Sequence, residues 1–324
     1  MLSGIFFALS AGLMWGLVFV APLLVPDYPA MQLSTGRYLA FGLIVLPLAW
    51  VDRKRLQQLT HRDWLEAFKL ATVGNLLYYL FLTAAIQRIG VPITSMLIGT
   101  LPVVMAVSAN LLYGRHDGRM PWRRLVPALL LIALGLLLVN LAELNGEAAD
   151  VPAGRYLGGM ALALLALVCW TWYPLRNARW LRQNPQRQPS TWATAQGLAT
   201  LPTALVGFIL VNSYLAVTTP DFALPFGPQP WRFITLIAVI GLFSSWLGTL
   251  CWNAASQRLP TVLVGPLLVF ETLSALTYTF ILRQSWPPLM TLAGILCLIV
   301  GVIYAMRIKL EPVVTRHSPD ISGA

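Results

Sequence analysis

One carboxylate stands out among the residues of this sequence that could carry chemistry. The chain has 12 acidic residues, and Glu271 is the one near the middle of a long apolar segment. A charged side chain at membrane depth is costly, so it usually faces the protein interior and serves function. Glu271 could bind the ammonium group of a substrate or a proton. The alternative is a structural carboxyl that is hydrogen-bonded to neighbouring hydroxyl groups.

Arg37 is a basic residue inside a second apolar segment. It could neutralise Glu271 or meet a substrate carboxylate, which makes it a candidate charge partner. It could equally extend its guanidinium to the external headgroups, as long basic side chains do near helix ends. We favour the structural interpretation.

Polar side chains recur on one face of two apolar segments. Ser245, Thr249 and Trp252 follow the i, i+4, i+7 spacing of a helix face. Asn75 and Tyr79 occupy the positions 170 residues before Ser245 and Thr249. Because a polar face on an apolar helix avoids lipid, we expect both faces to line a central cavity. The candidate substrate-binding residues are Trp15, Asn75, Tyr78, Tyr79, Trp170, Ser245, Thr249, Trp252, Glu271, Ser274 and Tyr278.

Trp15 and Trp170 give this predicted cavity aromatic walls. Aromatic walls with few charges suit a small amphipathic or aromatic solute and permit cation–π contact. The alternative for these tryptophans is the interfacial belt that Trp and Tyr commonly form at both membrane surfaces.

Proline interrupts two apolar segments at corresponding places. The candidate gating positions are Pro92, Pro102, Pro260 and Pro266. Interrupted helices at matching places in two halves of a transporter point to the binding site, because the freed backbone carbonyls need a ligand or water. The alternative is a packing kink.

These residues require helices that cross a bilayer. Of the 324 residues, 57% are hydrophobic and 10% are charged, whereas a soluble domain carries roughly 25% charged residues. The composition excludes a cytosolic enzyme and a nucleic-acid-binding domain, although the net charge is +10. The predicted fold class is an all-α integral membrane protein with ten transmembrane helices of about 20 residues. The ten segments are residues 3–24, 30–50, 64–87, 91–113, 124–142, 156–175, 190–215, 232–257, 261–282 and 287–307.

Basic residues are distributed unevenly between the two sides of the predicted membrane. With the N-terminus inside, sixteen of the 22 Lys and Arg residues fall in cytoplasmic stretches and four on the opposite side. Cytoplasmic loops of membrane proteins carry such an excess. We therefore predict a multi-pass protein of the cell inner (plasma) membrane with both termini cytoplasmic.

The sequence also contains an internal repeat. Residues 84–88 (Ala-Ala-Ile-Gln-Arg) recur as residues 254–258 (Ala-Ala-Ser-Gln-Arg) at an offset of 170. We predict two five-helix repeats, residues 1–142 and 155–307, followed by a cytoplasmic tail, 308–324. Since five is odd, the second copy enters the membrane from the opposite side. Such inverted repeats are a transporter architecture with the substrate site at their interface.

Four short motifs follow one another in a familiar order. They are Met14-Trp15-Gly16 in the first helix, Gly36-Arg37-Tyr38 in the second, Leu101-Pro102-Val103 in the fourth, and residues 250–260 at the end of the eighth. Together they resemble the drug/metabolite transporter superfamily with two EamA-type repeats, over about residues 3–307. The family's Gly-Glu pair after the fourth helix is Gly114-Arg115 here. The resemblance implies a transporter, in most known cases an exporter of amino acids, other metabolites or drugs.

We expect a secondary transporter that exports small metabolites by alternating access, with aromatic or other apolar amino acids as the favoured substrates. A G-x-x-x-x-G-K-[ST] phosphate loop is missing from the sequence, so a solute gradient or proton exchange would drive transport. The alternatives are an exporter of multidrug cations and a flippase of lipid-linked sugars. We expect no enzyme, because an integral membrane enzyme acting on lipids would need a cluster of His, Asp or Glu at the interface.

No cofactor and no metal site are expected. The three cysteines lie in apolar runs, and the three histidines lie in polar loops or the tail, so no disulfide framework is implied. The expected partners are a small-molecule substrate and the lipid bilayer, with no nucleic acid. The sequence leaves monomer and homodimer open.

Overall fold

The fold is built from α-helices. The computed structural model describes residues 2–114, 118–143, 152–284, 286–309 and 311. Within these ranges the β-type pairing is a single isolated bridge between Arg119 and Glu311. Nine helices of the described chain are long and apolar enough to cross a membrane, and the shorter apolar helix Leu101–Leu112 adds a tenth apolar element. The protein is therefore an all-α integral membrane protein.

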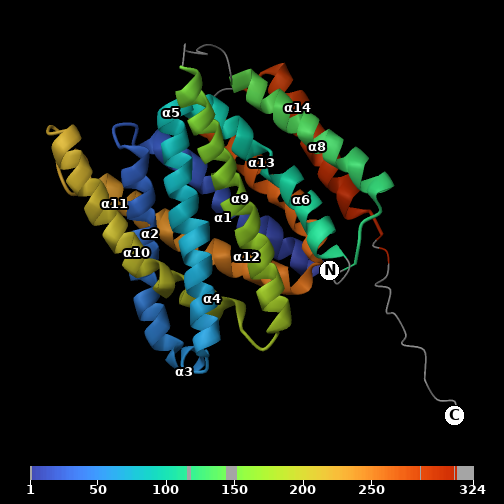
Figure 1. Cartoon of the computed structure of the whole chain (residues 1–324), viewed down its shortest axis with the longest axis horizontal. Helices are drawn as coiled ribbons and strands as arrows, with labels where there is room; N and C mark the ends of the chain where they lie inside the picture. The colour runs from blue at the N-terminus through green and yellow to red at the C-terminus, as the bar shows by residue number, and fades with distance from the viewer. Residues whose placement is uncertain (1, 115–117, 144–151, 285, 310, 312–324) are drawn as a thin grey trace.

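The elements fall into two groups along the chain (Figure 1). The first group is α1 (Leu2–Leu24), α2 (Ala30–Val51), α3 (Arg53–Leu56), α4 (His61–Ala71), η1 (Thr72–Leu77), α5 (Tyr78–Gly99), α6 (Leu101–Leu112) and α8 (Trp122–Glu143). The second group is α9 (Ala153–Gln183), α10 (Pro189–Thr218), α11 (Pro230–Ile240), η2 (Gly241–Leu247), α12 (Gly248–Arg258), η3 (Thr261–Leu263), α13 (Val264–Arg283) and α14 (Leu289–Met306).

The boundary between the third and fourth membrane segments differs from the prediction. Hydropathy separates residues 64–87 from 91–113, but α5 continues through that gap and α6 begins after Thr100. Thr100 Oγ1 donates to the carbonyl of Leu97 at 2.7 Å, and Pro102 lies in the first turn of α6. A proline there removes no helical hydrogen bond, so this turn is a natural place to begin a helix.

Helices α9 and α10 are longer than the apolar segments that predict them. They contain 31 and 30 residues, so each spans about 45 Å at 1.5 Å per residue, against a hydrocarbon core about 30 Å thick. Hydropathy marks where the apolar side chains end, whereas the backbone hydrogen bonds of α9 continue through the polar residues after Arg176. The additional turns of α9 still pack in the bundle, where Ala178 and Leu181 are fully buried.

Two of the long helices contain a π-helical segment. η1 lies between α4 and α5, and η2 lies between α11 and α12, which are matching places in the two predicted repeats. A π-turn inserts an extra residue, and such segments are frequent at functional sites. Gly74 of η1 rests on the ring of Tyr173, where an added Cβ would come within 2.5 Å of the ring atom Cδ2. Glycine is what allows η1 to approach α9 this closely.

The main helix contacts join the first group of elements to the second. α1 packs on α13, α2 on α10, α5 on α9 and α8 on α14. Figure 1 shows α8 and α14 side by side at one edge of the molecule and α2 with α10 and α11 at the opposite edge. Two inverted copies that interlock would produce such reciprocal pairs. The repeat boundaries themselves stay a prediction.

One side of the molecule gathers several connections and the start of the chain. Arg182 of α9 donates to the carbonyl of Leu259 at 2.6 Å, and Arg187 pairs with Asp63 at the start of α4. Gly4 of α1 lies against Leu259. We call this side, which carries Arg182, Arg187 and Arg258, the arginine-rich side. Its position on the cytoplasmic face of a membrane is a prediction from the charge distribution.

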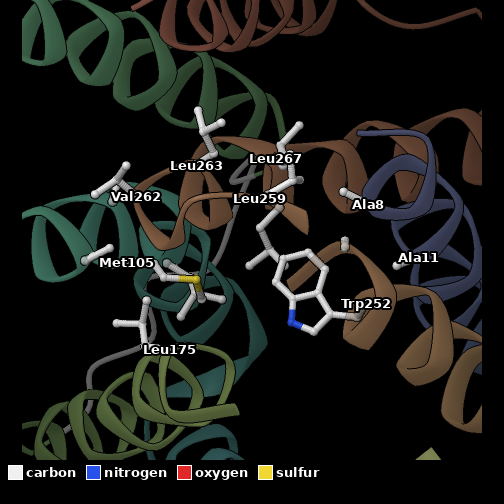
Figure 2. Close-up of a cluster of buried hydrophobic side chains, with 14 of the residues drawn as sticks. Ala8, Ala11, Met105, Leu175, Trp252, Leu259, Val262, Leu263 and Leu267 are labelled. Atoms are coloured by element: carbon white, nitrogen blue, oxygen red, sulfur yellow. The ribbon is translucent and has the colours of Figure 1, made fainter. Parts of the chain in front are cut away.

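The largest hydrophobic cluster occupies the space between the centre of the bundle and the arginine-rich side. Trp252 lies among side chains of α1, η3 and α13, as Figure 2 shows. A close backbone contact also joins α13 to α6: an added Cβ on Gly265 would lie 2.6 Å from the carbonyl oxygen of Pro102. The cluster fills this part of the bundle with apolar side chains.

Candidate functional site

A pocket lies where helices of both groups meet. Its wall combines aromatic rings, uncharged polar side chains and one guanidinium. The lining residues are Trp15, Arg37, Tyr38, Phe41, Asn75, Trp170, Tyr173, Gln196, Ser245 and Thr249. They come from α1, α2, η1, α9, α10, η2 and α12, so the pocket is shared between the two predicted repeats.

The pocket is nearly closed in this conformation. Its empty volume is about 350 Å³ when the space at its mouth is included, which is at the lower end of ligand sites, roughly 300–1,000 Å³. The enclosed part takes only about one water molecule. A solute the size of an amino acid would therefore need the helices around the pocket to move apart.

Arg37 points into this pocket and is held there by two contacts. Its Nε donates to Ser245 Oγ at 2.9 Å, and its guanidinium carbon lies 5.2 Å from the centre of the Tyr38 ring. This geometry differs from the favoured sequence interpretation, in which Arg37 reaches the headgroups. Ser245 is positioned by η2, where its hydroxyl also lies 3.4 Å from the carbonyl of Ile240.

A chain of hydrogen bonds forms the polar part of the pocket. Asn75 Nδ2 donates to Thr200 Oγ1 at 3.0 Å, and Thr200 Oγ1 donates to the carbonyl of Gln196 at 2.7 Å. The Tyr173 hydroxyl donates to Gln196 Oε1 at 3.0 Å, and Gln196 Nε2 donates to Asn177 Oδ1 at 2.8 Å. These bonds join η1 of the first group to α9 and α10 of the second, so they hold the polar wall in one geometry.

Stacked aromatic rings form the apolar part of the pocket wall. Trp170 stacks between Tyr78 and Tyr173, with ring centres 4.8 Å and 5.4 Å apart. The ring centres of Trp15 and Trp252 are 5.1 Å apart, at the border between the pocket and the hydrophobic cluster. Trp252 itself is only 2% exposed and belongs to that cluster (Figure 2). Of the predicted aromatic residues, Trp15 and Trp170 line the pocket, whereas Tyr78 and Trp252 support those that do.

Glu271 lies on α13 outside the pocket lining, and it is half-buried. Within the described chain it forms no ion pair, and no hydrogen bond is found for its carboxylate. The predicted charge partnership between Arg37 and Glu271 is therefore not a direct contact in this conformation, and it stays a prediction.

Three predicted residues use their hydroxyl groups for helix packing. Ser274 Oγ donates to a backbone carbonyl one turn earlier in α13 at 2.8 Å, and the Tyr278 hydroxyl donates to the carbonyl of Leu13 in α1 at 3.2 Å. The Tyr79 hydroxyl donates to the carbonyl of Ala30 at 2.5 Å, at the start of α2. None of the three is among the residues that line the pocket.

Three of the four predicted gating prolines lie at or near the start of a helix. Pro102 is in the first turn of α6, Pro260 is between α12 and η3, and Pro266 is in the first turn of α13. Pro102 and Pro266 are neighbours across the close contact that Gly265 makes. Pro92 is within α5, at a position whose side chain lies outside the described residues.

Ion pairs close the bundle on the arginine-rich side. Arg187 Nη2 lies 2.5 Å from Asp63 Oδ2. Arg176 donates to both carboxylate oxygens of Glu66, from Nε to Oε1 and from Nη2 to Oε2 at 3.0 Å. Gln257 Nε2 donates to the carbonyl of Arg187 at 2.8 Å. Asp63 and Glu66 are on α4, and their partners are on α9 and the α9–α10 connection. These pairs therefore tie the first half of the chain to the second.

Sequence reasoning missed four residues of the pocket wall, which are Tyr38, Phe41, Tyr173 and Gln196. Gln196 and Thr200 stand at i and i+4 in an apolar segment, so the periodicity that identified the stripe of Ser245 could have found them. Tyr38 and Phe41 carry no comparable signal, because aromatic side chains in membrane helices face lipid as well as protein.

Comparisons with known proteins identify a family, a relative and a solved structure of the same fold. The EamA-like transporter family matches residues 2–141. The inner membrane protein YtfF of Escherichia coli (strain K12) is 58% identical over 315 residues, which cover 97% of this chain and 98% of that protein. A solved crystal structure shares the fold with a TM-score of 0.72 at 16% identity, over 94% of this chain and 96% of that one.

Proposed function

This chain belongs to the EamA-like transporter family, a premise from which we propose that it exports small metabolites by alternating access. The favoured substrates are amino acids with aromatic or other apolar side chains. The observation that carries the proposal is the pocket between the two halves of the chain, because a site at such an interface can open to either side when the halves rock.

The chemistry of the pocket supports a small amphipathic solute. The stacked rings around Trp170 offer an apolar surface, and Asn75, Thr249 and Gln196 offer uncharged donors and acceptors. Ligand pockets combine a largely apolar wall with a few placed polar groups in this way.

The arginine-rich side is closed by the hydrophobic cluster around Trp252 and by the ion pairs of Asp63 and Glu66. A transporter must open this barrier in one state of its cycle, while the opposite side closes. The Escherichia coli relative is named as an inner membrane protein, and we place this chain in the same membrane with both termini cytoplasmic. Export then means movement from the arginine-rich side outward.

The second candidate is an exporter of organic cations. The stacked rings favour it, because aromatic faces attract cations. Arg37 disfavours it, because the charged side chain of the pocket wall is itself a cation.

Counterflow in proteoliposomes tests the proposal. Vesicles are preloaded with unlabelled tryptophan, threonine or a quaternary ammonium compound, and entry of the labelled partner is followed. Stimulated entry with an amino acid supports the favoured substrates, and stimulated entry with the ammonium compound alone supports the second candidate. Folded protein that shows counterflow with none of them would contradict a transporter of small solutes and turn attention to lipid-linked sugars.

A further inference from the structure

The pocket wall contains one charged side chain, that of Arg37. The nine other lining residues are aromatic or uncharged polar residues. Among the residues that the structure describes, the ion pairs within 4 Å involve Arg55, Arg176 and Arg187 but not Arg37. The pocket therefore carries a net positive charge that no contacting carboxylate of the described chain balances.

The guanidinium of Arg37 has binding capacity left. Its Nε is used by Ser245, whereas Nη1 and Nη2 make no hydrogen bond that the described residues show. A guanidinium presents its N–H groups in a planar fork that fits both oxygens of a carboxylate. Arg37 thus offers a fork to a ligand while its third nitrogen is anchored.

The anchoring contacts fix where that fork points. Ser245 is buried in the π-helical segment η2, and the Tyr38 ring lies beside the guanidinium. A side chain held by a hydrogen bond and a ring contact loses less freedom when a ligand binds, so its hydrogen bonds cost less entropy to form. Arg37 is half-buried, and partial removal from water strengthens the attraction between its guanidinium and an anion.

We propose that Arg37 binds the carboxylate of the transported solute, so that the pocket selects carboxylate-bearing solutes over cations. The inference rests on the proposed transport function and deepens it by naming the group that the site recognises. The aromatic rings of Trp15, Trp170 and Tyr173 then receive the apolar part of the same solute. The carboxylate of the solute supplies the negative charge that balances Arg37.

Glu271 is a carboxyl in the middle part of α13, and it has to be considered as a competitor for Arg37. In this conformation it is outside the pocket lining and makes no ion pair with Arg37 in the described chain. It therefore leaves the fork of Arg37 open to a ligand.

The test compares each amino acid with its decarboxylated twin. Tryptophan, phenylalanine and threonine are paired with tryptamine, phenethylamine and 1-amino-2-propanol, and each is assayed by counterflow and by competition in proteoliposomes. The wild-type protein is expected to transport at least one amino acid and to bind its twin at least about tenfold more weakly, because the guanidinium of Arg37 has no partner in the twin.

Three variants assign that preference to Arg37. Arg37→Gln should lose at least about tenfold in apparent affinity for the amino acid with little change for the amine, and Arg37→Lys should fall between. Ser245→Ala removes the hydrogen bond that anchors Arg37 and should lower the apparent affinity for the amino acid about threefold. Arg232→Gln is the matched control, because Arg232 is an exposed arginine of α11 that bonds only Gln229 in the described chain.

The outcomes separate the two proposals. If the wild-type protein transports amines as well as their amino acids, or if folded Arg37→Gln keeps the preference, the carboxylate assignment is wrong and the transport function stands. If Arg37→Gln does not fold, Arg37→Lys and Ser245→Ala decide, and unchanged preference in both overturns the assignment. If no solute of the panel shows counterflow with folded wild-type protein, the transport proposal fails and the assignment fails with it.

Discussion

Trp170 occupies the middle of a three-ring stack, which makes it the most informative aromatic residue of the pocket. It lies between Tyr78 and Tyr173. Each aromatic pair contributes about 0.5–1.5 kcal/mol beyond simple burial, so Trp170→Ala should raise the apparent KM for an aromatic solute about threefold to tenfold. Trp170→Phe should recover most of this loss. The KM values come from initial counterflow rates.

A matched control separates this effect from general damage. Trp231 is 80% exposed, and Trp231→Ala should leave KM unchanged. An aliphatic solute such as threonine should lose less affinity than tryptophan in Trp170→Ala. Equal losses for both solutes would mean that Trp170 supports the helices and does not contact substrate.

Glu271 tests how transport is driven. If this carboxyl carries a proton, Glu271→Gln should abolish uptake that depends on a pH gradient, because glutamine cannot bind and release a proton. Counterflow at equal pH on both sides requires no net proton movement, so it should continue. Both assays use the same proteoliposomes, with and without an imposed gradient. Uptake that still follows the pH gradient in Glu271→Gln would remove Glu271 from the coupling mechanism.

Single residues of the pocket could be anticipated only where a periodic signal exists. Asn75, Ser245 and Thr249 follow helix periodicity, and all three line the pocket. Ser274 and Tyr278 follow the same periodicity, yet Ser274 bonds to a backbone carbonyl of its own helix and Tyr278 to one of α1. Periodicity shows that a face avoids lipid, but it does not distinguish a face toward a cavity from a face toward another helix. A role in substrate binding stays a prediction for all of them.

At the scale of helices, α4 is tied to the second half of the chain by charge. Glu66 and Arg176 form an ion pair in which the Glu66 side chain is 4% exposed and the Arg176 side chain is 41% exposed. Removing one partner of a buried pair leaves the other uncompensated. Arg176→Gln should therefore lower the midpoint of thermal unfolding in detergent, because it leaves the buried Glu66 carboxylate unpaired, and Glu66→Gln should lower it by a smaller amount, because water solvates the exposed Arg176.

The double variant shows whether the two residues act on each other. The double variant Glu66→Gln/Arg176→Gln should lose less free energy of unfolding than the sum of the losses in the two single variants. The difference is the coupling energy, which we expect to be about 1 kcal/mol or more. The comparison requires the four proteins in one detergent and at one salt concentration. Strict additivity would show that the contact between α4 and α9 does not contribute through this pair.

The π-helical segment η1 depends on a glycine for its contact with α9. An added Cβ on Gly74 would meet the Tyr173 ring at 2.5 Å, whereas an added Cβ on Gly154 would meet nothing within 4 Å. Overpacking a tight contact costs about 1–3 kcal/mol. Gly74→Ala should lower both thermal stability and counterflow, because Tyr173 and Asn75 line the pocket. Gly154→Ala should change neither, and equal behaviour of the two variants would contradict the packing that we describe.

Hydropathy located the membrane helices well, because bilayer burial acts on composition over about 20 residues. It did not locate their internal irregularities. The π-turns η1 and η2 and the boundary at Thr100 depend on local hydrogen bonds and on close packing partners. The partners are distant in the chain, so no window of sequence contains both sides of such a contact.

At the scale of the whole molecule, the helices interlock in reciprocal pairs. α1 packs on α13 and α5 packs on α9, while α2 meets α10 and α8 meets α14. The repeated motif at residues 84–88 and 254–258 predicted two copies of one unit, and the paired π-segments lie at matching places in both. Which helix of one copy meets which helix of the other is a tertiary property that the repeat alone did not indicate.

The central claim is that the pocket opens alternately to the two sides of the membrane. It is tested by Asn75→Cys in a protein whose Cys169, Cys251 and Cys297 are replaced by alanine. A membrane-impermeant maleimide is applied to vesicles of either orientation, and the labelling rate is measured with and without Glu66→Gln. Since the closed pocket is too small for the reagent, labelling reports opening toward the side of addition.

Alternating access predicts labelling from both sides. It further predicts that Glu66→Gln speeds labelling from the arginine-rich side and slows it from the other, because the variant weakens the closure on one side only. Labelling from a single side under every condition, in protein that is folded and reactive after denaturation, would contradict alternating access.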